Sequence, residues 1–194
     1  MPRSARRLEK IRRVLAHRQP GLTVVMENIH DPHNVSAVFR TCDAVGVMRV
    51  ELLYTLEKFP RIGKKSSSSA NKWVDRRKHT SVDQCYAALR AEGFRIYATG
   101  IGGTSQSLYT LDLTGKIAFV LGNEHRGVSA EAAEKADAQV QIPMHGMIES
   151  LNVSVATGVC LYEAMRQRAA AGLFNSPQLP EGVLREMYEE WIRM

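Results

Sequence analysis

The sequence predicts an α/β fold in which a mainly parallel sheet carries helices on both faces. Short runs of β-branched residues alternate along the chain with stretches in which apolar residues recur at helical spacing. Such alternation requires crossover connections, which are typical of parallel sheets. The length of 194 residues fits one compact domain with short helical extensions at both ends. Ligands of such sheets bind beyond the carboxyl ends of the strands, so the loops there form the candidate site.

The first half of the chain is expected to contribute two helices and three strands. Ser4 and Asn34 can cap the helices, because their side chains accept hydrogen bonds from free backbone N–H groups. The second helix should end at Gly46 and bury an apolar stripe made of Val35, Val38, Cys42 and Val45. The expected elements are a helix over residues 4–17, a strand over 22–27, a helix over 34–46, a strand over 47–54, a polar serine-rich loop over 58–71 and a strand over 73–78.

The second half is expected to continue the alternation and to end in two helices. The expected elements are a helix over 81–93, strands over 94–98, 117–121 and 139–142, a helix capped by Ser129, a long helix over 151–171 closed by Gly172, and an amphipathic helix over 183–192. Three loops leave the carboxyl ends of strands in this half, after Ala98, Leu121 and Ile142. These loops are the predicted ligand site.

Cysteine usage and hydropathy indicate a reducing compartment without a membrane span. Cys42, Cys85 and Cys160 are odd in number and far apart, as buried thiols are and disulfide frameworks are not. His30 and His33 lie close together, but no further ligand stands at a zinc-site spacing, so we predict no metal. The chain shows no apolar run of membrane-spanning length and no signal-peptide core. We therefore expect a cytoplasmic protein.

Positive charge is concentrated in the first 20 residues. They hold seven basic side chains and one acidic one, a net charge of +6, which equals the net charge of the whole chain. A cationic segment on a neutral body is typical of a polyanion-binding protein, because phosphate contacts release counterions. The alternative is a solubilising tail.

The common catalytic and nucleotide-binding motifs are weak or absent. The run Gly100-Ile-Gly102-Gly103 follows a predicted strand, but Ser105 stands where the dinucleotide motif has its last glycine. Neither a Walker A sequence nor a G-x-S-x-G elbow is present. The residues by themselves therefore indicate a basic α/β domain that binds nucleic acid.

Three stretches, in the same order and at the same spacing, resemble the signatures of the SPOUT methyltransferases. They are Asn34-Val-Ser-Ala-Val-Phe-Arg40-Thr-Cys-Asp-Ala-Val-Gly46, Leu121-Gly-Asn-Glu124-His-Arg-Gly127 and Ile142-Pro-Met-His-Gly-Met-Ile-Glu-Ser150-Leu-Asn152-Val-Ser-Val-Ala156. The resemblance covers about residues 22–168. Within that superfamily the chain is similar to the TrmH type, because the arginine-rich first helix ends in Arg18-Gln-Pro20 and the segment 163–168 precedes a short helical tail.

The resemblance implies an activity, a topology and an assembly. Members of this type transfer a methyl group from S-adenosylmethionine to the ribose 2′-hydroxyl of guanosine-18 in the tRNA D-loop. They carry a deep trefoil knot at the C-terminal end of the domain, an exception to the rule of un-knotted chains, and they form homodimers. The implied division is a basic helical RNA-binding extension over residues 1–20, a SPOUT methyltransferase domain over 21–171 and a C-terminal helical extension over 172–194.

The resemblance also implies roles for particular residues. Expected catalytic residues are Arg40, Asn34, Glu124, Ser150 and Asn152. Expected contacts of S-adenosylmethionine are Thr99, Gly122, Ile142 and Leu151, and expected contacts of tRNA are Arg7, Lys10, Arg18, Arg166 and Arg168, with further contacts from the serine-rich loop over 61–71. Family relatives use the Arg40 position for catalysis. A guanidinium stays protonated at ordinary pH, so a phosphate clamp is physically easier for Arg40 than the role of general base.

Two other functions remain open from the sequence. The same chemistry could act on ribosomal RNA or on the wobble nucleotide of tRNA. A non-catalytic RNA-binding module on the same fold is the third reading, although Arg40 and Glu124 are both present.

Overall fold

The computed structural model describes residues 4–61, 70–102 and 105–194. Its centre is a seven-stranded sheet in the order β3-β2-β1-β6-β4-β7-β5, and every neighbouring pair is parallel. The strands are β1 (Leu22–Glu27), β2 (Arg49–Leu53), β3 (Asp75–His79), β4 (Arg95–Thr99), β5 (Gln106–Ser107), β6 (Ile117–Leu121) and β7 (Ala138–Gln141). The predicted parallel α/β sheet is confirmed.

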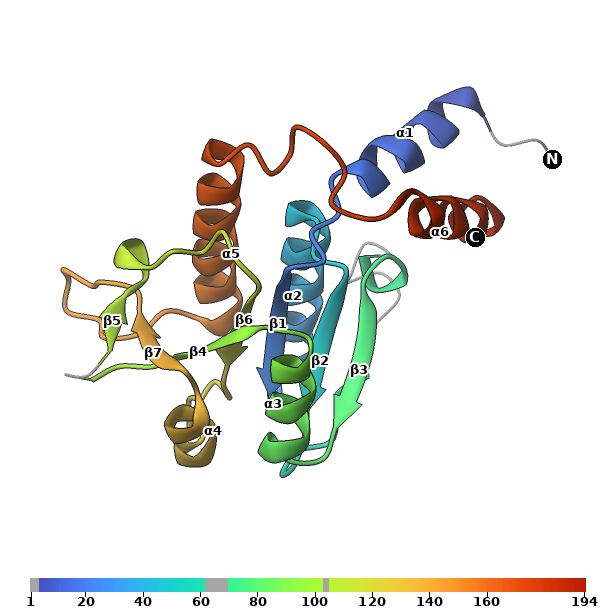
Figure 1. The fold of residues 1–194 in the computed structure, drawn as a ribbon. Coiled ribbons are helices and arrows are strands. Elements are labelled where there is room, and N and C mark those ends of the chain that lie inside the picture. Colours follow the sequence, from blue (N-terminus) through green and yellow to red (C-terminus); the bar gives the residue numbers. More distant parts are fainter. Residues whose placement is uncertain (1–3, 62–69, 103–104) are drawn as a thin grey trace.

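Helices cover both faces of the sheet, as predicted. The α-helices are α1 (Ala5–Ala16), α2 (Pro32–Val45), α3 (Val82–Ala91), α4 (Ala130–Lys135), α5 (Val153–Ala170) and α6 (Glu181–Arg193), with short 3-10 turns η1 (Ala70–Lys72) and η2 (Leu108–Thr110). Helices α3 and α4 lie on one face, and α2 and α5 lie side by side on the other (Figure 1). No helix among the described residues combines the length and apolarity that a membrane crossing requires.

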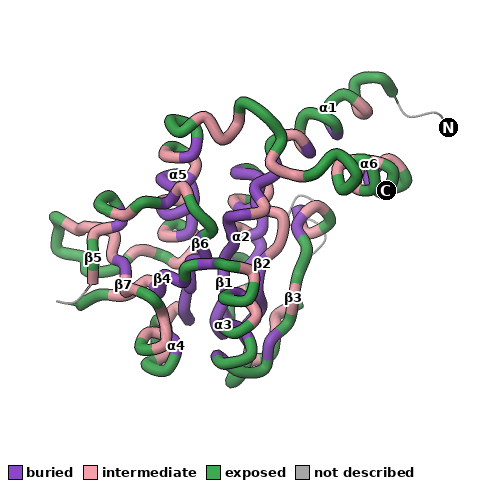
Figure 2. Tube along the Cα trace, viewed as in Figure 1, coloured by how far each residue is buried: buried purple, intermediate pink, exposed green. Residues whose placement is uncertain are grey.

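The alternating side chains of the central strands build two cores. Val24 and Met26 of β1 pack on the side of α2 and α5, whereas Val25 packs on the side of α3 and α4. Figure 2 shows the buried residues gathered in the central strands and on the inner sides of the helices. The predicted stripe on α2 is confirmed, because all four of its residues lie in the first of these cores.

Helices α1 and α6 come from opposite ends of the chain and pack against each other (Figure 1). Ile11 and Leu15 of α1 bury their side chains with Trp191 of α6. The Trp191 ring lies 4.7 Å from the ring of Trp73, between centroids, so the pair also touches the edge of the main domain. The basic helix is therefore held in place on the folded body.

Two local predictions need correction. Asn34 does not cap α2: Asp31 does so by accepting the His33 N–H at 2.7 Å, and Pro32 occupies the first turn. Proline suits the first helical position, since its missing N–H would have no partner there. Strand β3 begins two residues later than predicted, because η1 and Trp73 occupy the approach. Residues 62–69 of the predicted serine-rich loop lie outside the described residues.

Candidate functional site

A cleft of about 1110 Å³ opens at the carboxyl ends of β4, β6 and β7. Its walls are the three loops that the sequence singled out, which follow Thr99, Leu121 and Gln141. The lining combines apolar side chains with polar groups of the loops. The lining residues that matter below are Thr99, Gly122, Asn123, Glu124, Ile142, Ser150, Leu151 and Asn152.

The loop after β6 is folded tightly back onto the end of its own strand. Asn123 and Gly127 exchange backbone hydrogen bonds of 3.0 and 2.8 Å. A Cβ atom at Gly122 would lie 2.0 Å from the carbonyl carbon of Gly127, and Gly127 itself has a φ of +70°. Both positions therefore require glycine, and the tight loop holds the intervening Glu124 at the rim of the cleft.

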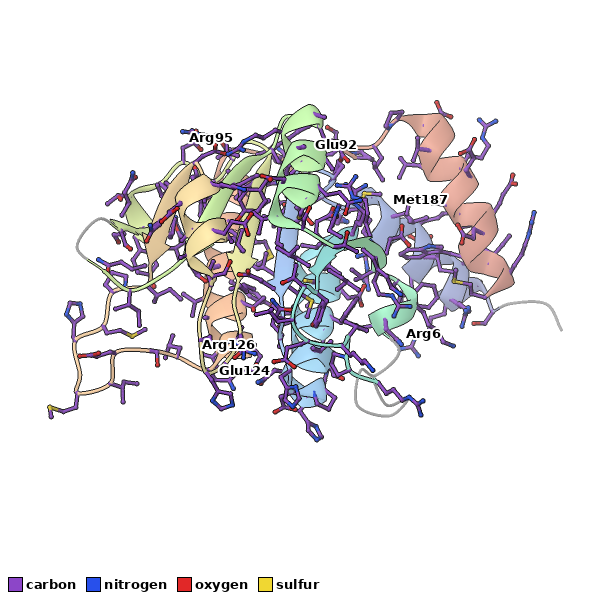
Figure 3. All side chains as sticks on the ribbon, turned by 90° about the horizontal axis from the view of Figure 1, so that it is seen from below. Arg6, Glu92, Arg95, Glu124, Arg126 and Met187 are labelled. Atoms are coloured by element: carbon purple, nitrogen blue, oxygen red, sulfur yellow. The ribbon has the colours of Figure 1, made fainter. Side chains whose placement is uncertain are left out.

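Glu124 is the centre of the site's hydrogen bonds. One carboxylate oxygen, Oε1, accepts the Asp31 N–H at 3.1 Å and the Asn34 side-chain amide at 2.9 Å. The other, Oε2, accepts the His30 N–H at 3.1 Å. The loop after β6 is thereby joined to the start of α2. Figure 3 shows Glu124 beside Arg126 at this end of the sheet.

Asn34 and Asn152 extend this chain of hydrogen bonds to the third loop. The Asn152 side-chain amide donates to Asn34 Oδ1 at 3.0 Å, and Asn152 Oδ1 accepts from the Ser154 N–H at 2.9 Å as the N-cap of α5. Glu124, Asn34 and Asn152 come from the three separate signature stretches. The fold brings them into one continuous network.

The Glu124 carboxylate is held in its charged form. Burial works to raise its pKa, but the hydrogen bonds from Asn34, His30 and Asp31 outweigh burial and keep the pKa below its ordinary value. A carboxylate with three donors is a poor proton acceptor. Its geometry suits a fixed negative group that orients loops and ligands.

The four predicted cofactor residues all line the cleft. The Thr99 hydroxyl donates to the Val120 carbonyl at 2.8 Å, so this side chain fixes the ends of β4 and β6 relative to each other. Gly146 lines the cleft and has open space where a Cβ would stand, so a ligand can approach the backbone there. Apolar walls with exposed backbone groups fit an adenosine-containing cofactor.

Arg40 and Ser150 differ in their relation to the cleft. Ser150 is exposed and lines it. Arg40 is exposed on α2, outside the lining, and its guanidinium makes no hydrogen bond or ion pair within residues 4–61, 70–102 and 105–194. The cleft of one chain therefore does not contain every residue that the sequence predicts for the reaction.

Two predicted RNA contacts are buried, and that prediction is corrected. Arg18 is 1% exposed and bonds to Asp43 at 2.9 Å and to the carbonyls of Val47 and Trp73. Arg168 is also 1% exposed, and its guanidinium donates to the carbonyls of Leu113, Gly21 and Gly115 and to Gln19. Neither guanidinium is open to a phosphate.

Arg168 holds a charge in the interior without a carboxylate partner among its hydrogen bonds. Burial lowers the pKa of Arg168 to about 10, which still leaves it protonated at neutral pH. Three backbone carbonyl oxygens from two segments satisfy it instead, so it fastens the end of α5 to the loop over 111–115 and to the start of β1. Its role in this structure is to tie segments together.

The remaining predicted RNA contacts lie at the surface. Lys10 is exposed on α1, and Arg7 is half-buried there. Arg166 is exposed, but both oxygens of Glu163 accept from its guanidinium at 2.8 Å. Arg166 holds the pKa of Glu163 below its ordinary value, so this pair is ionised and largely neutral overall.

Asn28, Asn123 and Glu57 were not singled out from the sequence. These residues fix the loops next to the cleft through their hydrogen bonds and ion pairs. Glu57 pairs with Arg126 at 2.8 Å, and Asn123 Oδ1 accepts the His125 N–H at 2.9 Å. Asn28 was detectable in part, because an asparagine directly after a buried strand is well suited to a left-handed turn. Asn123 lies inside the second signature stretch, next to Glu124.

Comparison with known proteins supports this picture over most of the chain. The profile of the SpoU rRNA Methylase family matches residues 21–162. A tRNA (guanosine(18)-2′-O)-methyltransferase of Thermus thermophilus is 41% identical over 191 residues, which cover 98% of each chain. The crystal structure of the Aquifex aeolicus TrmH/SpoU tRNA modifying enzyme superposes with a TM-score of 0.89 at 40% identity, covering 96% of this chain and 94% of that one.

A more distant structure contains the cofactor. The AdoMet-bound rRNA methyltransferase from Sinorhizobium meliloti is 26% identical with a TM-score of 0.62. The match covers 80% of this chain but only 59% of that one. The family profile covers most of the chain and the first relative matches nearly its full length, so the chain belongs to the SpoU rRNA methylase family.

Proposed function

We propose that the protein transfers the methyl group of S-adenosylmethionine to the ribose 2′-hydroxyl of guanosine-18 in the D-loop of tRNA. The observation that carries the proposal is the Glu124–Asn34–Asn152 network at the mouth of the cleft. The choice of tRNA rests on relatives named tRNA (guanosine(18)-2′-O)-methyltransferases, whose match extends through both helical extensions. The rRNA methyltransferase from Sinorhizobium meliloti matches over a smaller share of its own length.

Different residues of the cleft are assigned to cofactor binding and to positioning of the ribose. S-adenosylmethionine, when bound, supplies an electrophilic methyl group. The loops at Thr99, Gly122, Ile142 and Leu151 hold the nucleoside against apolar walls and exposed backbone groups. Glu124 and Asn34 fix the start of α2 against the second loop, and Asn152 fixes the third loop, so the ribose oxygen meets a rigid surface.

The proton of the 2′-hydroxyl needs an acceptor other than Glu124, whose oxygens already receive three hydrogen bonds. A guanidinium offers only hydrogen-bond donors, so Arg40 is not the acceptor. Its guanidinium can bind a phosphate of the RNA and hold a phosphate oxygen or a water beside the hydroxyl. Arg40 then acts as the clamp that completes the site.

We further propose a cytoplasmic homodimer in which Arg40 of one subunit reaches the cleft of the other. Two observations support it. Arg40 lies outside the cleft of its own chain. Large apolar side chains are exposed on the third loop and on α5, namely Met147, Ile148, Val155 and Tyr162.

The deep trefoil knot and the domain division are part of the same proposal. The end of α5 passes beside the loop over 111–115, where the Leu113 N–H donates to Gln167 at 2.9 Å and Arg168 binds the Leu113 carbonyl. This crossing of a late helix against an earlier loop supports a knotted domain over residues 21–171. The basic helix α1 would belong to the RNA-binding extension over residues 1–20, and α6, which packs against it, to the C-terminal helical extension over 172–194.

Methylation of defined transcripts tests the function directly. Purified protein, S-adenosylmethionine and a tRNA transcript should give one added methyl group on the ribose of nucleotide 18, located by nuclease digestion and mass spectrometry. A transcript with guanosine-18 replaced by adenosine and a ribosomal RNA fragment are the controls. Methylation of the ribosomal fragment or of the wobble nucleotide alone would reassign the substrate, and tRNA binding without methylation would indicate a non-catalytic RNA-binding module.

A further inference from the structure

Strand β3 is the edge strand of the sheet, and its side chains alternate between two different surfaces. Its register against β2 pairs Arg76 with Val50, Arg77 with Glu51 and Lys78 with Leu52. Val50 and Leu52 pack in the core under α2, so Arg76 and Lys78 also lie on the α2 side. Arg77 lies on the α3 side.

The α3 side of this edge is electrically balanced. Arg77 bonds to Glu51 at 2.8 Å and to Glu92 at 2.5 Å, and Arg49 bonds to the same two carboxylates. Two arginines thus face two glutamates. This side has no cationic capacity left for a ligand.

The α2 side of the edge carries unpaired charge. Arg76 and Lys78 are exposed, and neither forms an ion pair with any residue in the described parts of the chain. The Arg76 guanidinium lies 5.9 Å from the ring centroid of Phe39 on α2, directly before the exposed Arg40. The cations of the edge strand therefore lie beside the helix that carries Arg40.

The same edge connects the basic helix to the carboxyl ends of the strands. Lys72 of η1 is exposed and precedes Trp73, which contacts Trp191 of the α1–α6 pair. From there β3 runs along the side of the sheet towards the end where the cleft opens, with Lys78 nearest that end (Figure 1). The cations therefore form a path and not an isolated cluster.

We propose that Lys72, Arg76 and Lys78, here called the β3 edge surface, bind the phosphate backbone of the RNA substrate between the α1 helix and Arg40. The proposal rests on the proposed function and names RNA contacts beyond the predicted ones. Phosphates match the surface because it offers guanidinium and ammonium groups, while the Glu51 and Glu92 carboxylates lie on the opposite face of the edge. The competing role for such charges is to keep an edge strand from pairing with another sheet.

The double variant Arg76→Gln/Lys78→Gln separates these roles when it is compared with Arg95→Gln/Lys116→Gln. The control removes the same charge from exposed positions, and Arg95 also lies 5.9 Å over a tyrosine ring, as Arg76 lies over a phenylalanine. Figure 3 places Arg95 on the opposite side of the molecule from α2. Binding of a tRNA transcript is measured from 50 to 300 mM salt, roughly the range in which phosphate contacts lose their affinity.

The β3 variant should raise the Kd for tRNA at least about fivefold and lower the salt slope by about 1 to 2, because each lost phosphate contact removes nearly one released counterion. The control variant should bind like wild type. Equal binding by wild type and the β3 variant, or equal losses in both variants, would overturn the proposal and leave edge protection. Lys78→Gln alone keeps the test valid if the double variant unfolds, and it should lower the slope by about half as much.

The two proposals fail in different ways. Wild-type protein that binds tRNA through the β3 edge surface but adds no methyl group at nucleotide 18 contradicts the proposed function only. Methylation of nucleotide 18 with a salt slope that the β3 variant leaves unchanged contradicts the β3 edge surface only.

Discussion

The side-chain amide of Asn123 donates to the backbone carbonyl of Asn28 at 2.8 Å, which joins the end of β1 to the loop after β6. Asn28 has a left-handed backbone with a φ of 50°. Its own side-chain oxygen accepts three consecutive backbone N–H groups at 3.0 to 3.1 Å, those of Thr55, Leu56 and Glu57. Asn28 thus positions the loop after β2 and the loop after β6. The Glu57–Arg126 ion pair joins these two loops directly.

Replacement of Asn28 should separate its backbone role from its side-chain role. Asn28→Gly keeps the left-handed backbone and the Asn123 hydrogen bond but loses the three accepted N–H groups, so the free energy of unfolding should fall by about 1 to 2 kcal/mol. Asn28→Ala loses the same bonds and adds strain at positive φ. Its free energy of unfolding should therefore be lower than that of Asn28→Gly by about 1 kcal/mol. Urea unfolding measures both. The matched control Thr55→Ala removes only the 3.2 Å contact with the Asn28 amide and should change little.

Activity provides the second measurement for Asn28. Asn28→Asp retains an oxygen that can accept the three N–H groups, so it should recover much of the kcat that Asn28→Gly loses. Equal kcat values for wild type and Asn28→Gly would mean that the loop over 54–57 has no influence on the site.

Glu51 supplies a stability prediction away from the cleft. Its side chain is fully buried and bonds to Arg77, Arg49 and His79. Glu51→Gln removes the buried carboxylate from His79 and leaves Arg49 and Arg77 with Glu92 alone, so it should lower the free energy of unfolding by about 3 kcal/mol near neutral pH. Glu92 contacts the same two arginines from a half-exposed position. Glu92→Gln should therefore lower the free energy of unfolding by less than about 1 kcal/mol. Equal effects of the two variants would contradict the importance of burial.

The pH dependence of the Glu51 effect has a defined sign. Burial works to raise the pKa of Glu51, but hydrogen bonds from Arg77, His79 and Arg49 outweigh it and leave the pKa below its ordinary value. The unfolded chain has a glutamate pKa near about 4.3. The contribution of the charged carboxylate is therefore fully present above that value and is lost as the pH falls through the lower pKa of the folded state. The difference between wild type and Glu51→Gln should shrink below about pH 4.

Some of these features follow from local sequence and others depend on distant parts of the chain. The α2 stripe and the three loops at strand ends were predictable, because helical periodicity and the geometry of parallel sheets are local rules. The Asp31 cap was also readable, since Pro32 directly after it marks a first helical turn. The prediction of Asn34 as the cap was wrong because asparagine is also a preferred capping residue, and local sequence offers both candidates.

Arg18 and Arg168 could not be assigned correctly from sequence. Charged residues are rarely buried in full, so a basic segment is ordinarily expected at the surface. The acceptors that satisfy Arg168 are backbone carbonyls at Gly21, Leu113 and Gly115, more than 50 positions before it in the chain. Only the folded arrangement brings these groups together.

The dimer proposal makes a prediction about mixed subunits. Arg40→Ala alone should lower kcat more than tenfold, a barrier change above about 1.4 kcal/mol, with cofactor affinity nearly intact. Glu124→Ala should also be inactive, since it removes the acceptor of His30, Asp31 and Asn34. Mixed dimers of these two variants contain one intact site only if Arg40 and Glu124 of a site come from different subunits.

Co-expression of the two inactive variants tests this arrangement. Random pairing makes about half of the dimers mixed, each with one complete site, so about a quarter of wild-type activity should return. Mixed dimers can be isolated with two different affinity tags. If they remain inactive, Arg40 and Glu124 of one site belong to the same subunit. A monomer by sedimentation that methylates tRNA would contradict the dimer itself.

The basic helix should govern RNA affinity, and the fold determines how to test it. Deletion of residues 1–18 would uncover Trp191 and remove the buried Arg18, so it would confuse affinity with stability. Arg6, Lys10 and Arg13 are exposed along one face of α1, since their spacing of four and three residues matches the helical repeat. Their triple replacement by glutamine should raise KM for tRNA, flatten its salt dependence and change the free energy of unfolding by no more than about 0.5 kcal/mol.

Arg18→Ala should show the opposite pattern, because its guanidinium bonds to Asp43 and stacks 5.0 Å over the Trp191 ring. Its loss should lower the free energy of unfolding by about 3 kcal/mol, while the salt dependence of tRNA binding by the folded fraction should stay close to that of wild type. At saturating tRNA, kcat of the triple variant should fall far less than that of Arg40→Ala. If the triple variant keeps the KM and the salt slope of wild type, the first helix is a solubilising segment and the RNA is held elsewhere on the molecule.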